Sequence, residues 1–337
     1  MLDFNTLDLP TLFQELAHDG QIRRLYELAF AEDLGPTGID GDVTAKAFVP
    51  ATARAVADVV FRQVGVLAGL ATAPIILDVF RADVDIHTLV NDGMPVSPGV
   101  SVARLSGSLR HILAVERTLL NTIGRLSGIA TGTRLCVDAV AMSAIADLEH
   151  PPNPLPKSVT HPRTIVLDTR KTVPGHRALE KYAVRCGGGH MHRMGLYDAV
   201  LIKDNHIAGL RADLAAIGAP FDLTSAVKQA VRKARDAADT HGLRFIELEV
   251  DSLTDLEAIL AAGGCGVQIV LLDNMTPAQL AQAVALRDTS RLPVKLEASG
   301  GITPDRIAEF ARSGVDRISL GSLTHGAKSL DVGLDIA

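Results

Sequence analysis

The sequence predicts an α/β protein in two parts, a small N-terminal α+β domain and a C-terminal βα barrel. The barrel is predicted by the chain after residue 164, where apolar, β-branched runs alternate with segments long enough for a crossover helix. These runs end at Asp168, Lys203, Glu249, Asp273, Ala298 and Gly321. The N-terminal domain is predicted because residues 1–110 carry helix and strand patterns without this regular alternation.

The elements of the N-terminal part follow from periodicity and turn residues. In chain order we expect helices at 12–17 and 22–32 and strands at 54–62, 83–90 and 100–105. A helix is then expected from 110 to about 145, with an interruption near Ser127-Gly128, followed by a proline-rich loop at 151–162. The last residues, 329–336, alternate like a strand that returns to the N-terminal domain. We therefore place the N-terminal domain at 1–128, joined by 328–337, and the barrel at 129–327.

The barrel competes with one other architecture, a doubly wound open sheet. Every predicted strand from residue 164 onward ends in a polar, glycine or small residue, and a barrel uses the carboxyl ends of all its strands for chemistry. An open sheet would bind its ligand at one switch point instead, so the barrel is favoured. Two of its helices are expected to begin at Thr276-Pro277 and Thr303-Pro304, each a cap residue followed by proline.

The charge distribution predicts a pocket for a small polyanion. The chain of 337 residues has a formal net charge of −6. Between 170 and 203, however, only Glu180 and Asp198 oppose seven cations, namely Arg170, Lys171, Arg177, Lys181, Arg185, Arg193 and Lys203. A protein that binds nucleic acid usually spreads basic charge over a face and carries a basic overall balance.

Composition excludes several other classes. The longest uncharged apolar run, 64–77, is short and contains Pro74, so no membrane span is expected. The N-terminus lacks the basic and apolar regions of a signal peptide. Three cysteines far apart, Cys136, Cys186 and Cys265, indicate reduced thiols and not a zinc site or disulfides. A cytoplasmic protein is expected, with no nucleic-acid partner.

Candidate binding residues lie at the predicted strand ends. Arg170-Lys171 follows one strand, and two adjacent cations there indicate either a neutralising anion or carboxylates, or equally a solvated loop. His192-Arg193 follows three glycines that allow close approach to a ligand. A metal pair of His190 and His192 is disfavoured because no third ligand is placed nearby. Lys203 ends a buried strand and must reach either a substrate or an acid.

Carboxylates and glycines at later strand ends complete the candidate site. Glu249 and Asp273 are expected to hold Mg²⁺, directly or through water, or to pair with the cations of the empty site. The glycine-rich Ser299-Gly300-Gly301 and the later Gly321-Ser322 resemble backbone cradles for an anion. In barrels a phosphate often binds at the last two βα loops, where both segments fall.

These motifs together resemble the quinolinate phosphoribosyltransferase family. The matching segments, in family order, are 32–35, 42–44, 116–121, 126–131, 168–172, 192–196, 201–206, 248–250, 272–274 and 299–301. The resemblance implies an N-terminal α/β sandwich and an incomplete, TIM-like barrel of six or seven strands. It implies a homodimer or larger assembly, and a pentosyltransferase of NAD biosynthesis that uses Mg²⁺. The implied reaction converts quinolinate and phosphoribosyl pyrophosphate to nicotinate mononucleotide, pyrophosphate and CO₂.

The resemblance also assigns roles to individual residues. Arg117 would reach a quinolinate carboxylate from the partner subunit, and Thr169, Arg170, His192 and Arg193 would line the same acid. Lys171 and Lys203 would meet the pyrophosphate and developing charge, with Glu249 and Asp273 on magnesium, the ribose hydroxyls or both. The 5-phosphate cradle would consist of Ser299, Gly300, Gly301, Leu320, Gly321, Ser322 and His325.

Two departures and three alternatives accompany the resemblance. Position 191 is Met where the family usually has Asn, and the loop 149–162 is longer and richer in proline than usual. One alternative is a paralogue acting on another heterocyclic acid, such as those encoded with molybdate-transport genes. A second is a barrel lyase with a Schiff base on Lys203. A third is a non-catalytic anion-binding protein, which would not need both acids and cations.

Overall fold

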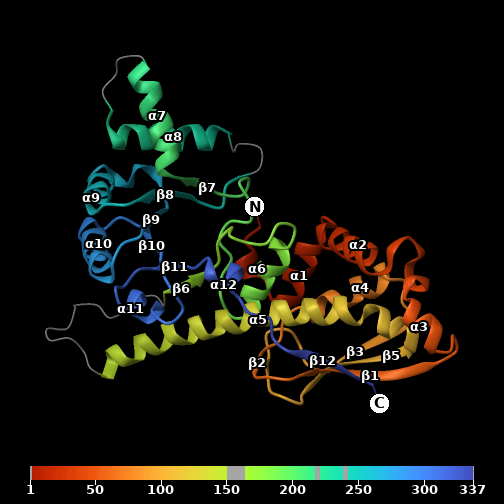
Figure 1. The fold of residues 1–337 in the computed structure, drawn as a ribbon. Helices are drawn as coiled ribbons and strands as arrows, with labels where there is room; N and C mark the ends of the chain where they lie inside the picture. Colours follow the sequence, from red (N-terminus) through yellow and green to blue (C-terminus); the bar gives the residue numbers. More distant parts are fainter. Residues whose placement is uncertain (1, 150–163, 217–220, 238–241, 337) are drawn as a thin grey trace. The chain divides into compact units, whose positions relative to one another are not determined.

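The computed structural model describes residues 2–149, 164–216, 221–237 and 242–336 (Figure 1). Contacts between residues divide the chain into two compact units. The first unit contains 1–3, 135–170 and 192–320, and the second contains 4–134, 171–191 and 321–337. These units do not test the domain boundary expected at 128/129, which stays a prediction.

The first unit is built on six parallel strands in the order β6-β11-β10-β9-β8-β7. The strands are β6 (Ile165–Leu167), β7 (Val200–Ile202), β8 (Ile246–Val250), β9 (Ile269–Asp273), β10 (Lys295–Ser299) and β11 (Arg317–Ser319). β6 and β7 form the two ends of this order and do not pair within the described part of the chain. The sheet is therefore an incomplete α/β barrel of six strands, which confirms the predicted fold.

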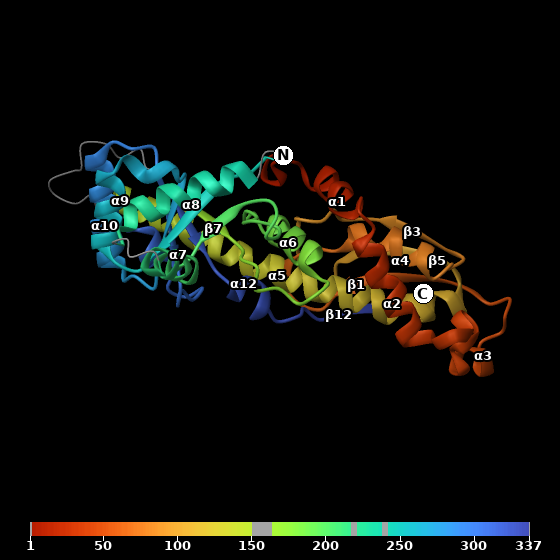
Figure 2. The same ribbon diagram turned by 90° about the horizontal axis from the view of Figure 1, so that it is seen from above.

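Helices follow the strands of this sheet, as the sequence rhythm predicts. They are α7 (Asp204–Ala216), α8 (Leu223–Ala237), α9 (Leu253–Ala261), α10 (Pro277–Ser290) and α11 (Ile307–Ala311). Neighbouring helices α9 and α10 lie side by side, as two perpendicular views show (Figure 2). The strands bury apolar side chains that include Leu248, Val270, Leu296 and Ile318.

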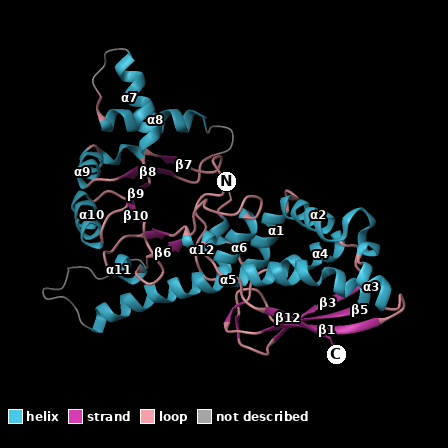
Figure 3. Cartoon of the chain, in the orientation of Figure 1, coloured by secondary structure: helices cyan, strands magenta, loops and turns pink. Residues whose placement is uncertain are grey.

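The second unit contains a four-stranded antiparallel sheet in the order β12-β1-β5-β3 (Figure 3). Its strands are β1 (Arg54–Phe61), β3 (Val84–Thr88), β5 (Ser101–Ser108) and β12 (Val332–Ile336), and β2 (Gly65–Val66) pairs separately with β4 (Pro95–Val96). The pairing of β12 with β1 brings the last strand beside the first, the return that alternation at 329–336 predicts.

The helices of this unit include α1 (Leu9–Ala17), α2 (Gln21–Leu34), α3 (Val43–Phe48), α4 (Ala73–Val79), α6 (Arg177–Cys186) and α12 (Ser322–His325). Short 3-10 segments occur at Phe4–Thr6, Gly35–Gly41, Leu70–Thr72 and, in the first unit, Gly263–Gly266. Among the described residues no helix has both the length and the apolar character that a membrane span requires.

The predicted interruption of the long helix is wrong. α5 runs without a break over Leu109–Glu149. Gly128 is small for a packing reason, because a Cβ atom there would overlap the carbonyl oxygen of Lys328. Close approach of another chain segment thus explains the glycine that the sequence pattern interprets as a helix break.

One of the two predicted helix starts is also wrong. Thr276 caps α10, and its side chain accepts a hydrogen bond from the Gln279 amide while the Gln279 side chain bonds back. Thr303, in contrast, begins a turn that is closed by a 3.0 Å hydrogen bond from Arg306 N to its carbonyl. α11 starts only at Ile307, after this turn. The proline-rich loop predicted at 151–162 lies outside the described residues.

Candidate active site

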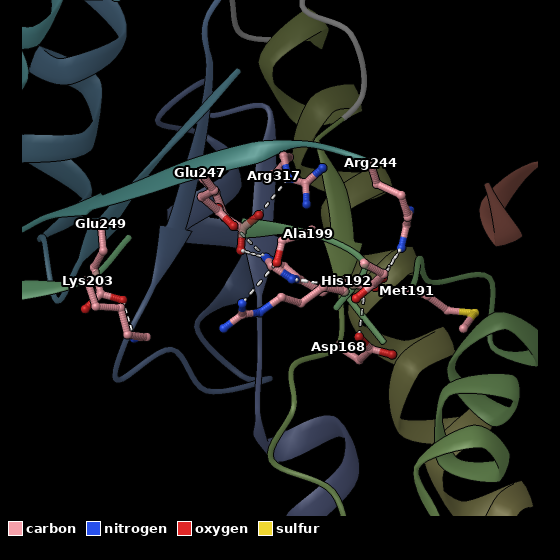
Figure 4. Close-up of polar contacts among 12 residues, drawn as sticks. Asp168, Met191, His192, Ala199, Lys203, Arg244, Glu247, Glu249 and Arg317 are labelled. Atoms are coloured by element: carbon pink, nitrogen blue, oxygen red, sulfur yellow. Dashed lines mark hydrogen bonds and ion pairs between the residues drawn. The ribbon is translucent and has the colours of Figure 1, made fainter. Parts of the chain in front are cut away.

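Three predicted site residues lie at the carboxyl ends of neighbouring strands in the first unit. Lys203 follows β7, Glu249 is near the end of β8, and Asp273 is the last residue of β9. β7 pairs with β8, and β8 with β9, so their carboxyl ends meet at one edge. The Lys203 Nζ atom forms an ion pair with Glu249 Oε2 (Figure 4). The two signs of charge therefore neutralise each other in the free protein.

A cavity of about 560 Å³ lies beside Glu249 and Asp273. Its lining includes five carboxylates, from Asp204, Glu249, Asp251, Asp255 and Asp273. On its α7 side, the Arg211 guanidinium lies 4.2 Å from the centre of the Phe221 ring. Carboxylate oxygens are the ligands that Mg²⁺ prefers. Among the described residues, however, the group of three that lies close enough to share a metal ion is His192, Glu247 and Glu297. Magnesium at Glu249 and Asp273 therefore stays a prediction.

The segment that carries His192 and Arg193 is fixed by side chains, since no helix or strand includes residues 191–199. The His192 amide donates to Asp168 Oδ1 at 2.9 Å, and its carbonyl accepts from Arg244 at 3.2 Å. The next backbone amides, at 194 and 195, donate to the carboxylate of Asp198 at 2.8 and 2.9 Å. The carboxylates of Asp168 and Asp198 are buried because they accept hydrogen bonds from backbone amides that have no partner in a helix or strand.

The His192 ring lies in the interior of the first unit with only 6% of the residue exposed. Its Nε2 atom is 3.0 Å from Glu247 Oε2 and 3.4 Å from Glu297 Oε1 (Figure 4). Glu297 in turn pairs with Arg317, whose Nε is 2.6 Å from Glu297 Oε2. Both ring nitrogens of His192 therefore contact protein groups, because Nδ1 accepts a hydrogen bond from the Arg193 amide at 2.8 Å.

Burial and charge oppose each other in this cluster. Burial disfavours a charged His192, but the carboxylates of Glu297 and Glu247 outweigh it and raise the pKa of His192 to about 9. Burial and the neighbouring Glu297 raise the pKa of Glu247. Nδ1 accepts a hydrogen bond from the Arg193 amide, so Nε2 is the ring nitrogen that directs a proton at the two acids.

Two arginines near this segment form the cationic part of the site. Arg193 is 7% exposed, and burial followed by repulsion from Arg170 lowers its pKa. One Arg193 amine donates to the Ala199 carbonyl at 3.2 Å. The Nε atom of Arg170 is buried without a hydrogen-bond partner. Two mutually repelling guanidinium groups, one with an unsatisfied buried donor, favour binding of an anion.

Further predicted residues gather in the second unit around Gly321. The Thr324 hydroxyl donates to the Lys171 carbonyl at 2.7 Å. A Cβ atom on Gly321 would lie 2.8 Å from Lys171 Cδ and 3.2 Å from His325 Nε2. The hydroxyl of Ser322 is buried without a hydrogen-bond partner. Glycine at position 321 therefore lets the side chains of Lys171 and His325 lie close against its backbone.

The remaining residues predicted for the phosphate cradle lie in the first unit. Gly300 and Gly301 have φ angles of +86° and +61°, which favour glycine, and a Cβ on Gly300 would overlap the side chain of Asn274. Ser299 accepts the Asn274 amide at 2.9 Å. Leu320 is buried and donates its amide to the Leu167 carbonyl.

Thr169 and Arg117 complete the predicted set. Thr169 directly precedes Arg170 and is half-buried. Arg117 lies on α5 of the second unit, is largely exposed, and forms an ion pair with Glu116. Its role in a neighbouring subunit's site stays a prediction.

Comparison with known proteins decides the family. The model of the quinolinate phosphoribosyl transferase C-terminal domain matches residues 155–335, and that of the N-terminal domain matches residues 42–127. The chain belongs to the quinolinate phosphoribosyltransferase family. It is 38% identical to the nicotinate-nucleotide pyrophosphorylase [carboxylating] of Mycobacterium leprae, over 88% of this chain and 91% of the relative. A probable enzyme of the same name from Bacillus subtilis is 36% identical over 94% and 93%.

Solved structures of the quinolinate phosphoribosyltransferase family agree with the fold. The nicotinate-nucleotide pyrophosphorylase of Francisella tularensis superimposes with a TM-score of 0.76 at 31% identity, and the match covers 100% of both chains. A Streptococcus pyogenes structure gives a TM-score of 0.74 at 34% identity, covering 94% of this chain and 98% of the other. The incomplete barrel and the antiparallel sheet are thus features of this family.

Several residues around the site were not predicted from the sequence. Asp251 and Asp255 line the cavity, Glu247 and Glu297 contact His192, and Arg244 binds its carbonyl. A signal existed for Glu247, because it lies two residues before Glu249 and strand side chains alternate with a period of two. An acid within an otherwise apolar strand needs a buried partner. No comparable signal in the sequence links Arg244 to residue 192.

Proposed function

We propose that this protein catalyses the reaction of quinolinate with phosphoribosyl pyrophosphate, giving nicotinate mononucleotide, pyrophosphate and CO₂ in NAD biosynthesis. The observation that carries the proposal is a division of charge at the site in a member of this family. Arg170 and Arg193 lie close enough to repel each other, and one guanidinium donor of Arg170 is unsatisfied, while Glu249 and Asp273 line a carboxylate-rich cavity. A dicarboxylate acid and a sugar with developing positive charge need opposite environments of this kind.

The cationic residues would bind the acid. The residues lining the carboxylates of quinolinate would be Thr169, Arg170, His192 and Arg193, and the partner subunit of a homodimer would supply Arg117. Preorganised charge in a site with little water stabilises a transition state more than the same charge in solution does. Holding the acid against the sugar supplies a further large part of the rate enhancement.

The acidic residues would act on the sugar. Glu249 and Asp273 would hold Mg²⁺, which neutralises the charge of the departing pyrophosphate when it is bound. Their carboxylates would also stabilise positive charge on the ribose ring. Lys203, now paired with Glu249, and Lys171 would meet the pyrophosphate. Ser299, Gly300, Gly301, Leu320, Gly321, Ser322 and His325 would form the cradle of the 5-phosphate.

We further propose that the protein works in the cytoplasm. Cys136, Cys186 and Cys265 are all buried and free. Burial raises the pKa of the Cys136 thiol to about 11, so this thiol is a poor nucleophile and is protected from oxidation. Reduced thiols of this kind are typical of reducing compartments.

The deciding experiment measures pyrophosphate release by the purified protein with quinolinate, phosphoribosyl pyrophosphate and Mg²⁺, omitting each in turn. Release that requires all three supports the proposal. Turnover with a different heterocyclic acid and not with quinolinate would instead identify a paralogue. Borohydride trapping of a keto acid on Lys203 would identify a Schiff-base lyase.

Nicotinate provides a stricter test of the residues proposed to bind quinolinate, and we predict that it does not replace quinolinate as a substrate. The cationic groups proposed for the acid exceed the need of one carboxylate, so a monoacid would leave buried charge unpaired at a cost of several kcal/mol. Steady-state kinetics with both acids measure the difference. Comparable kcat/KM values for the two would contradict the assignment of a dicarboxylate.

A further inference from the structure

The N-terminal segment makes two specific contacts with the chain around His192. Asn5 bonds to both backbone groups of Met191, since its Oδ1 accepts from Met191 N at 2.7 Å and its Nδ2 donates to Met191 O at 3.0 Å. This is the pair of hydrogen bonds that a neighbouring β-strand would supply. The Met191 side chain is apolar and 1% exposed, so it offers no polar group of its own.

The second contact runs through Arg244. Asp3 Oδ1 accepts a hydrogen bond from Arg244 at 3.2 Å. Arg244 also donates to the His192 carbonyl at 3.2 Å and to Asp198 at 3.3 Å, and only 9% of its side chain is exposed. Asp3 thus balances the charge of an arginine that holds the backbone of residue 192 (Figure 4 shows Arg244 beside His192 and Met191).

These contacts matter because segment 191–195 lacks the support of regular structure. Its backbone groups are held by side chains from residues distant in sequence, namely Asn5, Asp168 and Arg244, and by the nearby Asp198. Asp3 and Asn5 also lie outside residues 42–127, the span that the family's N-terminal domain model matches. The support at positions 3 and 5 is therefore additional to the motifs that identify the family.

We propose that Asn5 and Asp3 are positioning residues that hold the acid-binding segment His192-Arg193 in place. This inference rests on the proposed function of that segment. Neither residue touches the acid. Asn5 fixes the backbone one residue before His192, and Asp3 orients Arg244, which fixes the His192 carbonyl. Loss of either support lets the two cations move, and small displacements of binding groups reduce rates by up to roughly 100-fold.

The test compares Asn5→Ala and Asp3→Asn with wild type and with Asp8→Ala. Asp8 is the matched control, because it also lies in the N-terminal segment but only caps α1, through a 2.8 Å hydrogen bond from the Thr11 amide. We expect both test variants to raise KM for quinolinate by roughly 10-fold or more while KM for phosphoribosyl pyrophosphate stays within about twofold. Asp8→Ala should change neither KM.

Hydrogen–deuterium exchange gives a readout that does not depend on activity. We expect faster exchange of a peptide covering 188–198 in Asn5→Ala, and wild-type exchange there in Asp8→Ala. The Asp3 side chain is 53% exposed, so Asp3→Asn keeps the fold even if Asn5→Ala does not. If the wild-type protein has no activity but Asn5→Ala still shows faster exchange of this peptide, the proposed function is refuted and the positioning role is retained. Wild-type exchange and wild-type quinolinate KM in both variants, or equal rises in both KM values, would overturn the inference.

Discussion

At the scale of single residues, the interior of the first unit contains charges that must compensate one another. Glu247 and Glu297 are both 0% exposed and face His192, while Arg317 pairs with Glu297. Burial alone would raise the pKa of Glu297, but the charges of His192 and Arg317 lower it to about 2. Such a cluster is costly to form and more costly to break, since removing one partner leaves a buried charge uncompensated.

This compensation predicts how the stability difference between Glu297→Gln and wild type depends on pH. Because the pKa of Glu297 is lowered from its ordinary 4.5 to about 2, its charge stabilises the fold above pH 4.5, and this contribution is lost as pH falls towards 2. The variant should thus be destabilised by several kcal/mol at neutral pH, with the difference from wild type shrinking below pH 4.5. Urea unfolding across pH measures it. A difference independent of pH, or one equal to that of the surface variant Glu309→Gln, would contradict the prediction.

A second prediction at this scale concerns the two acids at the cavity. Glu249→Gln and Asp273→Asn should each lower kcat by roughly 10²- to 10³-fold, because each removes charge proposed to act on the metal and ribose. Quinolinate binding should change little, since neither acid is assigned to the dicarboxylate. Kinetics and calorimetry separate the two effects, with exposed Glu257→Gln on α9 as the control. Loss of quinolinate binding in either variant would show that the assigned roles are wrong.

Residues at strand ends could be predicted from the sequence, and residues that support them mostly could not. Lys203, Glu249 and Asp273 follow apolar runs, and parallel strands bring their carboxyl ends together. The contacts of Asn5 with Met191 and of Arg244 with His192 join residues that are far apart in the chain. Periodicity describes local structure, so it carries no information on which distant side chain satisfies a particular backbone group.

At the scale of elements, local chemistry predicts a helix boundary well when the signal lies within the helix. The capping box of α10 is such a signal, with Thr276 and Gln279 bonding to each other's backbone. The apparent break in α5 has a different origin, because Gly128 makes room for the backbone at Lys328. A glycine needed for packing and a glycine that ends a helix look the same in a single sequence.

Two glycines on α5 therefore predict opposite effects of alanine. Gly128→Ala should destabilise the protein by roughly 1–3 kcal/mol or more, because the added methyl group overlaps the Lys328 carbonyl. Gly132→Ala meets nothing within 4 Å and should stabilise by about 1 kcal/mol through helix propensity alone. Thermal and urea unfolding of both variants measure these effects. Equal stability changes in the two would contradict the packing explanation of Gly128.

At the scale of the whole molecule, the alternation of strands and helices after residue 164 sufficed to predict a barrel-like sheet. The sequence pattern did not reveal that β6 and β7 would remain the two ends of the strand order, which was an implication of the family resemblance. Assembly is a further step, because single-chain patterns do not show which exposed side chain serves a neighbouring subunit. Arg117, exposed on α5, is the residue predicted to serve the site of a neighbouring subunit.

A mixing experiment tests whether Arg117 acts across a dimer interface. Arg117→Ala and Lys203→Ala should each be inactive alone. If Arg117 serves the neighbouring subunit, a mixed dimer has one site with both residues intact and one with neither. Random 1:1 reassociation of a two-fold dimer should then restore roughly a quarter of wild-type sites. If Arg117 serves its own subunit, every site in every mixture lacks one residue.

The subunits are exchanged by partial denaturation, with wild type treated in parallel to measure recovery. Native mass spectrometry of the two variants, one carrying a mass tag, confirms that mixed dimers have formed. Activity near the expected quarter supports a shared site and places Arg117 in the neighbour's acid pocket. Confirmed exchange without recovered activity rules it out, because a shared site requires that one of the two sites in each mixed dimer be complete.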